Sequence, residues 1–147
     1  MKKFVFRLET LLNHRRNIEE RERIKFSRIR SELLAELNHL EMLEAKQAET
    51  RSELASEESG KCDEREISCF CRFLDRLSRE MAVSRERVTR LEQELEAQKQ
   101  IMIEASRDKK MIENLRLKKQ KEFLVSLERQ EQKSVDELVV TRFALKQ

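Results

Sequence analysis

The sequence predicts an all-α protein whose two long helices form an antiparallel coiled-coil hairpin, the second helix being longer with a C-terminal overhang. Three observations predict this fold: turn-forming residues are scarce, apolar residues recur about every 3.5 positions, and a single break falls near the middle. The chain of 147 residues has one Gly, no Pro and 41% charged residues. Such charge is common in disordered chains, but 38% of the residues are hydrophobic and regularly spaced, which favours packed helices.

The whole chain, residues 1–147, is expected to form one coiled-coil domain. Helix one is expected at about 4–57, a turn at about 58–63 and helix two at about 64–143. The turn contains Gly60, the one glycine, and Asp63 or a neighbour is expected to cap the second helix.

Helix two carries the clearer repeat. Alternate steps of three and four residues from Ile67 to Ile112 visit fourteen positions, of which eleven are apolar. The polar exceptions are Ser84, Gln98 and Lys109. This 3.5-residue period is typical of a coiled-coil seam, the line of residues that faces the partner helix.

Helix one has a less regular stripe of apolar residues. It is interrupted by Arg15 and Glu22, and it shifts phase near Phe26 and again near Leu37, which would alter the supercoil locally. The members of this stripe are Phe4, Leu8, Leu11, Ile18, Ile29, Leu33, Leu37, Leu40, Leu43 and Leu54.

A hairpin folded at the glycine brings together residues whose numbers sum to about 120. This rule pairs Leu8 with Ile112 and Leu40 with Met81. It leaves roughly thirty C-terminal residues without a partner helix, although a lone helix is stabilised mainly by burying its apolar face. The sequence therefore predicts a binding partner for the apolar residues of this overhang: Phe123, Leu124, Leu127, Val135, Leu138, Val139 and Phe143.

Several function classes are disfavoured. His14 and His39 have no acid–base partner at a useful spacing, and Cys62, Cys69 and Cys71 lack zinc-ligand spacing. One glycine cannot form a Gly-rich phosphate loop. We therefore expect no enzyme, no cofactor and no metal.

Membrane insertion is also disfavoured. No apolar run is long enough to span a membrane, and Arg7 and Glu9 interrupt the start of the chain, which otherwise begins like a signal peptide. The interpretation is a cytosolic protein.

Charge is unevenly distributed. Residues 1–30 carry ten basic and four acidic side chains, residues 31–60 carry two and eight, and residues 107–147 carry eleven and seven. The basic stretch at 107–121 has three interpretations: a solvated face, a docking surface for an acidic protein, or a nucleic-acid patch. The last is disfavoured because no aromatic residue interleaves with the charges.

Phe73 lies one position off the predicted seam, and Met42 lies off the seam of the other helix. A single exposed apolar residue is ordinary. The two could also form a small docking patch near the tip of the hairpin.

The chain ends resemble those of the flagellar export protein FliJ family. At the start, the resemblance rests on Lys3-Phe4, Leu8-Glu9, Leu11-Leu12, Arg15-Arg16 and Glu19-Glu20. At the end, it rests on Lys119-Gln120-Lys121, Glu131-Gln132-Lys133 and Asp136-Glu137. The length and the two-arm layout fit along the entire chain.

This resemblance implies a stalk-like, non-enzymatic component of the flagellar type III export apparatus at the inner face of the cell membrane. Its implied partners are the hexameric flagellar export ATPase, the cytoplasmic domain of the membrane export gate, and export chaperones. The family's gate-binding pattern falls on Leu43, Phe73 and Leu77. Together with the uncovered apolar end, the resemblance assigns ATPase binding to Phe4, Leu8, Leu11, Arg15, Phe123, Leu127, Glu131, Gln132, Asp136, Glu137 and Phe143.

Three other hypotheses remain open. The chain could be the equivalent stalk of a virulence type III system. It could be a self-associating structural coiled coil, in which the overhang pairs with its copy. It could also be a nucleic-acid-binding rod, which would lose affinity steeply with salt.

Overall fold

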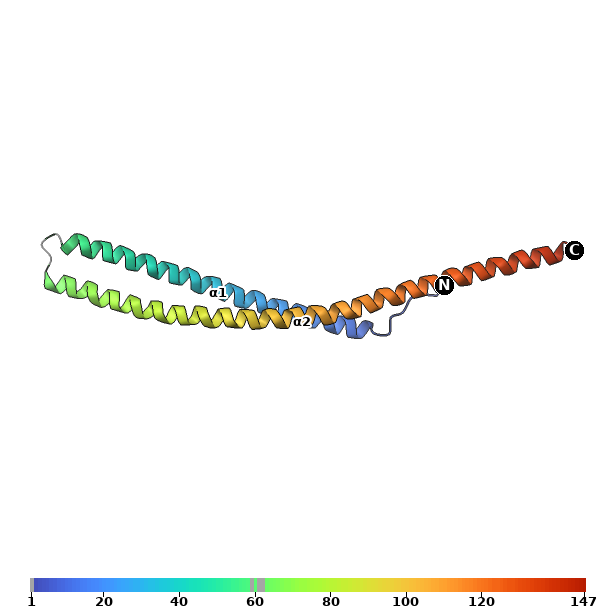
Figure 1. The fold of residues 1–147 in the computed structure, drawn as a ribbon, viewed down its shortest axis with the longest axis horizontal. Coiled ribbons are helices and arrows are strands. Elements are labelled where there is room, and N and C mark those ends of the chain that lie inside the picture. Colours follow the sequence, from blue (N-terminus) through green and yellow to red (C-terminus); the bar gives the residue numbers. More distant parts are fainter. Residues whose placement is uncertain (1, 59, 61–62) are drawn as a thin grey trace. The chain divides into compact units, whose positions relative to one another are not determined.

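The computed structural model describes residues 2–58, 60 and 63–147, without the side chains of residues 57 and 58. The chain forms two helices, α1 (Glu9–Glu58) and the longer α2 (Glu64–Leu145), which pack against each other (Figure 1). The predicted fold class is therefore confirmed. Residues 59, 61 and 62 of the turn expected at about 58–63, among them Cys62, lie outside the described residues.

Helix α2 begins directly after Asp63. The carbonyl oxygen of Asp63 accepts hydrogen bonds from the backbone nitrogens of Glu66 (3.1 Å) and Ile67 (3.3 Å). Glu64 and Glu66 place negative charge in the first turn, where it interacts favourably with the helix dipole.

Helix α1 begins at Glu9, five residues later than expected. Residues 2–8, which we call the N-terminal strap, are not helical and lie along α2 (Figure 1). A more extended backbone advances up to about 3.3 Å per residue and a helix only about 1.5 Å. The strap therefore reaches further along α2 than another turn of α1 would, and Phe4 contacts Phe123.

The contacts divide the chain into two units. Unit 1 comprises Met1–Arg21 with Ile103–Gln147, and unit 2 comprises Glu22–Met102. In each unit a segment of α1 packs against a segment of α2.

The α1 seam in unit 2 is regular. Steps of three and four residues visit buried or half-buried side chains throughout: Glu22, Phe26, Ile29, Leu33, Glu36, Leu40, Leu43, Gln47, Thr50 and Leu54. The expected phase shifts near Phe26 and Leu37 are therefore absent, and Leu37 is an exposed neighbour of Glu36. The prediction was wrong because it followed apolar residues alone, whereas the seam passes through polar ones.

The α2 seam agrees with the predicted repeat at every position from Ile67 to Ile112, because each side chain there is buried or half-buried. The core of unit 2 centres on Leu43, Leu77 and Met81, with Leu40 and Phe73 packed against them. Leu40 and Met81 share this cluster, as the predicted pairing requires.

Unit 1 has a smaller core. Leu12 is fully buried (0% exposed), whereas the predicted seam residue Leu11 is 38% exposed. The α1 seam of unit 2 continues into unit 1 with the same alternating steps of three and four residues, through buried Glu19, half-buried Arg15 and buried Leu12. These steps place Leu12 in the seam and its neighbour Leu11 beside it. Across the described residues, neither helix has a stretch apolar enough to cross a membrane.

Candidate partner-binding surfaces

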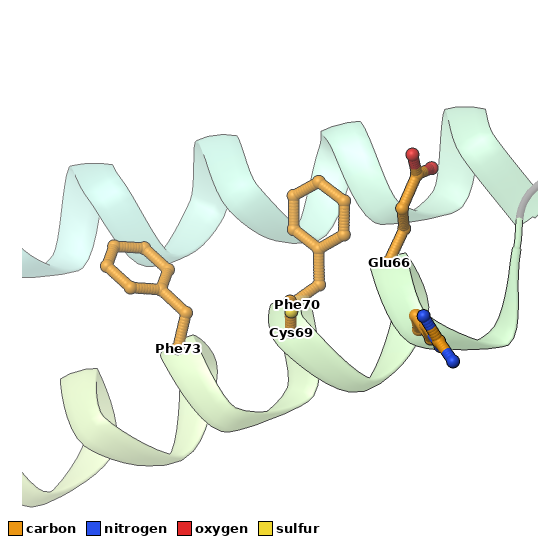
Figure 2. A pocket seen from close by; sticks show the side chains of 5 residues that line it. Glu66, Cys69, Phe70 and Phe73 are labelled. Atoms are coloured by element: carbon orange, nitrogen blue, oxygen red, sulfur yellow. The ribbon is translucent and has the colours of Figure 1, made fainter.

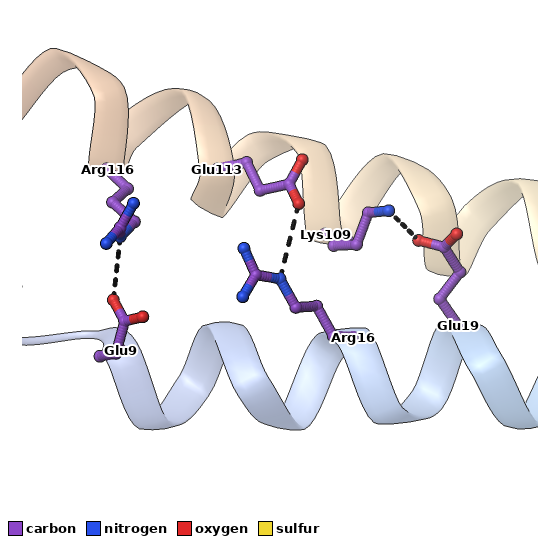
Figure 3. A network of polar contacts seen from close by, with 6 residues as sticks. All are labelled: Glu9, Arg16, Glu19, Lys109, Glu113 and Arg116. Carbon is purple, nitrogen blue, oxygen red and sulfur yellow. Dashed lines mark hydrogen bonds and ion pairs between the residues drawn. The ribbon is translucent and has the colours of Figure 1, made fainter.

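Ion pairs join the helices of unit 1, and Figure 3 shows three of them. Glu19 Oε2 lies 2.7 Å from Lys109 Nζ, Glu9 Oε2 lies 3.0 Å from Arg116 Nε, and Glu113 Oε1 lies 3.7 Å from Arg16 Nε. The Glu19–Lys109 pair is the most shielded from water, so its attraction is the least screened. Part of the basic stretch at 107–121 therefore binds α1 instead of facing solvent.

These ion pairs join residues about two helical turns further along α2 than the sum rule predicts. Leu8 likewise lines a groove with Leu115 and Phe123, beyond its predicted partner Ile112. The long Arg and Lys side chains contribute to the offset, because each can reach past its own turn.

Unit 2 has two polar contacts within its seam. Ser84 Oγ donates a hydrogen bond to Glu36 Oε1 (2.7 Å). Gln98 Nε2 donates to the carboxylate of Glu22 and to its backbone carbonyl oxygen (3.1 Å). The hydrogen bond from Gln98, assisted by nearby Lys25, lowers the pKa of Glu22 below its ordinary value, although burial opposes this shift.

Each polar position predicted in the α2 seam thus meets a glutamate of α1: Ser84 meets Glu36, Gln98 meets Glu22, and Lys109 meets Glu19. A buried polar group is costly without a partner. A displaced register would separate these partners, so the contacts favour one alignment of the helices within each unit.

The N-terminal strap packs on the start of the α2 overhang. The rings of Phe4 and Phe123 lie 5.7 Å apart between centroids and are tilted by 52°, an arrangement favourable for aromatic pairs. The strap and α2 form a groove lined by Lys3, Phe4, Val5, Phe6, Arg7, Leu8, Leu115, Lys119 and Phe123. The overhang therefore has an intramolecular partner at Phe123, contrary to the expectation that nothing in the chain covers it.

A second groove extends this contact. Lys2 and Lys3 line it together with Leu127, Glu131 and Val135 of α2. The lysines and Glu131 are of opposite charge, so they favour this placement of the strap. Leu127 is half-buried, whereas every residue from 128 to 147 is exposed.

Beyond the strap, the overhang exposes many large apolar side chains, including Phe143 at 71%. The exposed set contains Leu124, Val125, Val135, Leu138, Val139, Val140, Phe143 and Leu145. Single exposed apolar residues are ordinary, but a concentration on one segment is typical of an interaction site.

The structure brings some of the residues assigned to ATPase binding together and leaves others apart. Phe4, Leu8 and Phe123 line one groove, and Leu127 and Glu131 line the next. Leu11 is partly exposed at the edge of the seam, and Arg15 pairs with Asp108 at 3.4 Å. The remaining residues of the set, Gln132, Asp136, Glu137 and Phe143, are all exposed on α2.

The residues assigned to ATPase binding from the sequence did not include Lys2, Lys3 and Phe6 of the strap, nor Leu115 and Lys119 opposite them. Phenylalanines within a basic segment are a weak indication of a binding site. Residues 4–8 were expected to be helical, however, and a helix would not extend as far along α2 as the strap does. Val140 and Leu145 could have been found from hydrophobicity alone.

The surface assigned to the export gate is largely core. Leu43 is 5% exposed and Leu77 is 3% exposed, and they pack against each other. Phe73 lies one position off the seam and was expected to be exposed there; instead it packs half-buried against this cluster. The Phe73 backbone lies beside the seam, and its side chain is long enough for the ring to reach the seam cluster. Met42 is exposed.

Phe73 nevertheless keeps one face accessible. Phe73 lines an apolar groove together with Phe70 and Cys69. The rings of Phe70 and Phe73 point toward α1 (Figure 2). The guanidinium carbon of Arg76 lies 5.4 Å from the centre of the Phe73 ring, which places a cation over an aromatic face.

The remaining candidates form no cluster. His14, His39, Cys69 and Cys71 are exposed, and both described cysteines are free thiols. Within residues 2–58, 60 and 63–147, no group of His, Cys, Asp or Glu is arranged to hold a metal ion.

Comparison with protein families matches residues 3–147 to the family described as "Flagellar FliJ protein". The comparisons with curated proteins and with solved structures found no match.

Proposed function

This chain belongs to the flagellar FliJ protein family, and we propose that, as a component of the flagellar export apparatus, it binds and stimulates the export ATPase through its α2 overhang and links that ATPase to the membrane export gate. The family match favours the flagellar system over a virulence secretion system. The proposed location is cytoplasmic, at the inner face of the cell membrane and held there by its partners.

One observation supports the ATPase contact most strongly: the exposed apolar side chains of the α2 overhang. Leu138, Val139, Phe143 and Leu145 lie in the last eight residues of α2 and are mostly exposed. Enclosing them in a partner would remove a large apolar area from water, which is the main favourable contribution to association.

A ring-shaped ATPase offers a central opening that could enclose this segment. Unit 1 also carries an excess of basic side chains, which would be attracted to an acidic lining. A single asymmetric helix contacts each subunit of a sixfold ring differently, so it would bias their nucleotide states and promote ring assembly. On this proposal the protein raises the ATPase rate without binding nucleotide.

The proposed gate contact involves Phe73, with Leu43 and Leu77 beneath it. Because these leucines are buried, their role would be to support the shape of the surface. The accessible side of Phe73 and the neighbouring Phe70 would provide the direct contact.

Removing residues 124–147 tests the ATPase contact. We expect the truncated chain to lose its stimulation of the purified export ATPase. It should remain helical and folded, because the seam and the Phe4–Phe123 contact are kept. ATP hydrolysis and circular dichroism are the measurements. A matched control replaces exposed Val83, which lies in unit 2, with Ala.

Full stimulation by the truncated chain would show that the overhang is not the coupling element. A full-length chain that forms a dimer through the overhang and does not bind the ATPase would instead favour a self-associating coiled coil.

A further inference from the structure

The N-terminal strap is attached to α2 through side chains. Among the described residues, the strap takes part in two backbone hydrogen bonds outside a helix: the N–H groups of Glu9 and Leu12 of α1 donate to the carbonyl oxygens of Phe6 and Leu8, and neither bond involves α2. The attachment includes the Phe4–Phe123 ring contact, and Lys2 and Lys3 line a groove together with Glu131. Val5 and Arg7 alternate with Phe4 and Phe6 and are exposed. Such a segment can detach without unfolding the helices.

The strap lies over residues of the proposed ATPase-binding set. Phe4 packs on Phe123, and the groove beside Lys2 and Lys3 contains Leu127 and Glu131. Phe123 and Leu127 are the last half-buried residues of α2 before its fully exposed segment. A partner that docks on that segment and advances along the same helix therefore meets the strap first.

We propose that the N-terminal strap is a detachable intramolecular cover, which a partner docking on the α2 overhang displaces. In the closed state Phe4 and Phe123 shield each other from water. In the open state both rings face the partner, together with the basic side chains Lys2, Lys3 and Arg7. The strap thus limits the apolar surface of the free protein and enlarges the binding surface once a partner arrives. The identity of that partner rests on the proposed function.

A fluorescence quenching experiment on the full-length chain tests this cover. The sequence contains no Trp or Tyr, so a tryptophan introduced as Phe4→Trp is the sole strong quencher. With all three cysteines replaced by Ser, a bimane dye on Lys119→Cys reports contact, because Lys119 lines the same groove as Phe4. The control places the dye on Arg142→Cys, which lies roughly 30 Å from Phe123 along α2.

We expect quenching of the dye at position 119 and none at position 142. Adding Phe123→Ala should relieve the quenching, because the strap loses its aromatic contact. Adding the purified export ATPase should relieve it as well, with the same concentration dependence as binding. Unquenched dye at position 119, or quenching that persists in Phe123→Ala, would overturn the cover.

The ATPase results separate this inference from the proposed function. Saturated ATPase binding with undiminished quenching would contradict displacement and leave the proposed function intact. ATPase binding by Phe4→Ala but not by the wild-type chain would show a cover that the partner cannot displace, and it would also contradict displacement. Failure of both chains to bind would overturn the proposed function and the displacement together, although quenching would still demonstrate the closed strap.

Discussion

At the scale of single residues, the polar positions of the seam carry much of the specificity of this hairpin. Leu, Met and Phe residues stabilise the packing, but they tolerate a change of register because they recur at every turn. Ser84 and Gln98 do not tolerate a change of register, because each has one glutamate partner on α1 that a shift would move away. Hydrogen bonds to a charged acceptor are stronger than neutral ones, so these contacts penalise misaligned forms.

The contact between Gln98 and Glu22 should make the stability of the folded chain depend on pH. Its hydrogen bond from Gln98 lowers the pKa of the Glu22 carboxyl in the folded state. The stabilising contribution of the charged form is therefore complete above the unfolded-state pKa of about 4.3. It is lost as the pH falls through the lower, folded-state value. Glu22→Gln removes the titrating group, so we expect the wild-type chain to be more stable than Glu22→Gln at pH 6 and to lose that advantage in strong acid.

Urea unfolding followed by circular dichroism between pH 2 and pH 7 measures this difference. Glu20→Gln, a change at an exposed neighbour on α1, is the matched control. A stability difference between wild type and Glu22→Gln that stays constant over this pH range would contradict the role given to the Gln98 contact.

Phe73 combines packing with the proposed gate contact. Truncation to Ala should cost about 2 kcal/mol of folding stability, less than a fully buried Phe because one side is accessible. Phe73→Ala should also weaken binding to the purified gate domain by tenfold or more, as is typical of an aromatic anchor that contributes about 2 kcal/mol. Thermal unfolding and titration calorimetry measure the two effects.

Phe73→Leu separates these roles. A leucine can still cover the Leu43–Leu77–Met81 cluster, so it should restore most of the stability without restoring binding. Met42→Ala, at an exposed position on α1, should change neither. Gate binding by Phe73→Leu at wild-type affinity would leave Phe73 with a packing role alone.

At the scale of the helices, the sequence predicts α2 well and α1 less well, for a physical reason. The α2 seam is apolar at most positions, so its period appears directly in the sequence. The α1 seam passes through Glu22, Glu36, Gln47 and Thr50. Glu22, Glu36 and Gln47 have hydrogen-bond partners on α2, which are Gln98, Ser84 and Ser78, and that information lies in the other half of the chain. The Thr50 hydroxyl instead donates to the Lys46 carbonyl oxygen within α1.

The N-terminal strap illustrates the same limit. Phe4 and Leu8 are separated by four residues, which is also the spacing of a helical face, so the local pattern favours extending α1 to the start. The structure departs from this pattern because Phe123 is within reach of an extended segment. Whether residues 2–8 continue the helix or form the strap is decided by the contact between Phe4 and Phe123, which are far apart in the sequence. Phe4, Leu8 and Phe123 could thus be recognised as candidates from the sequence, but not their mutual packing.

At the scale of the whole molecule, little of the chain is core and much of it is surface. Few of the residues that the structure describes are fully buried, so the stability of each unit depends on many half-buried seam contacts. Exposed apolar side chains concentrate on the α2 overhang, which is the strongest physical indication that the protein acts through association.

Site-specific photo-crosslinking to the export ATPase tests the central claim most directly. A photoreactive phenylalanine analogue replaces Phe143 in one variant of the overhang and Val83 in a control variant, both at exposed positions. The account predicts covalent products with the ATPase from position 143 and none from position 83, at protein concentrations that stimulate ATP hydrolysis. Products from position 83, with none from position 143, would show that the ATPase binds elsewhere on the chain and would contradict the account.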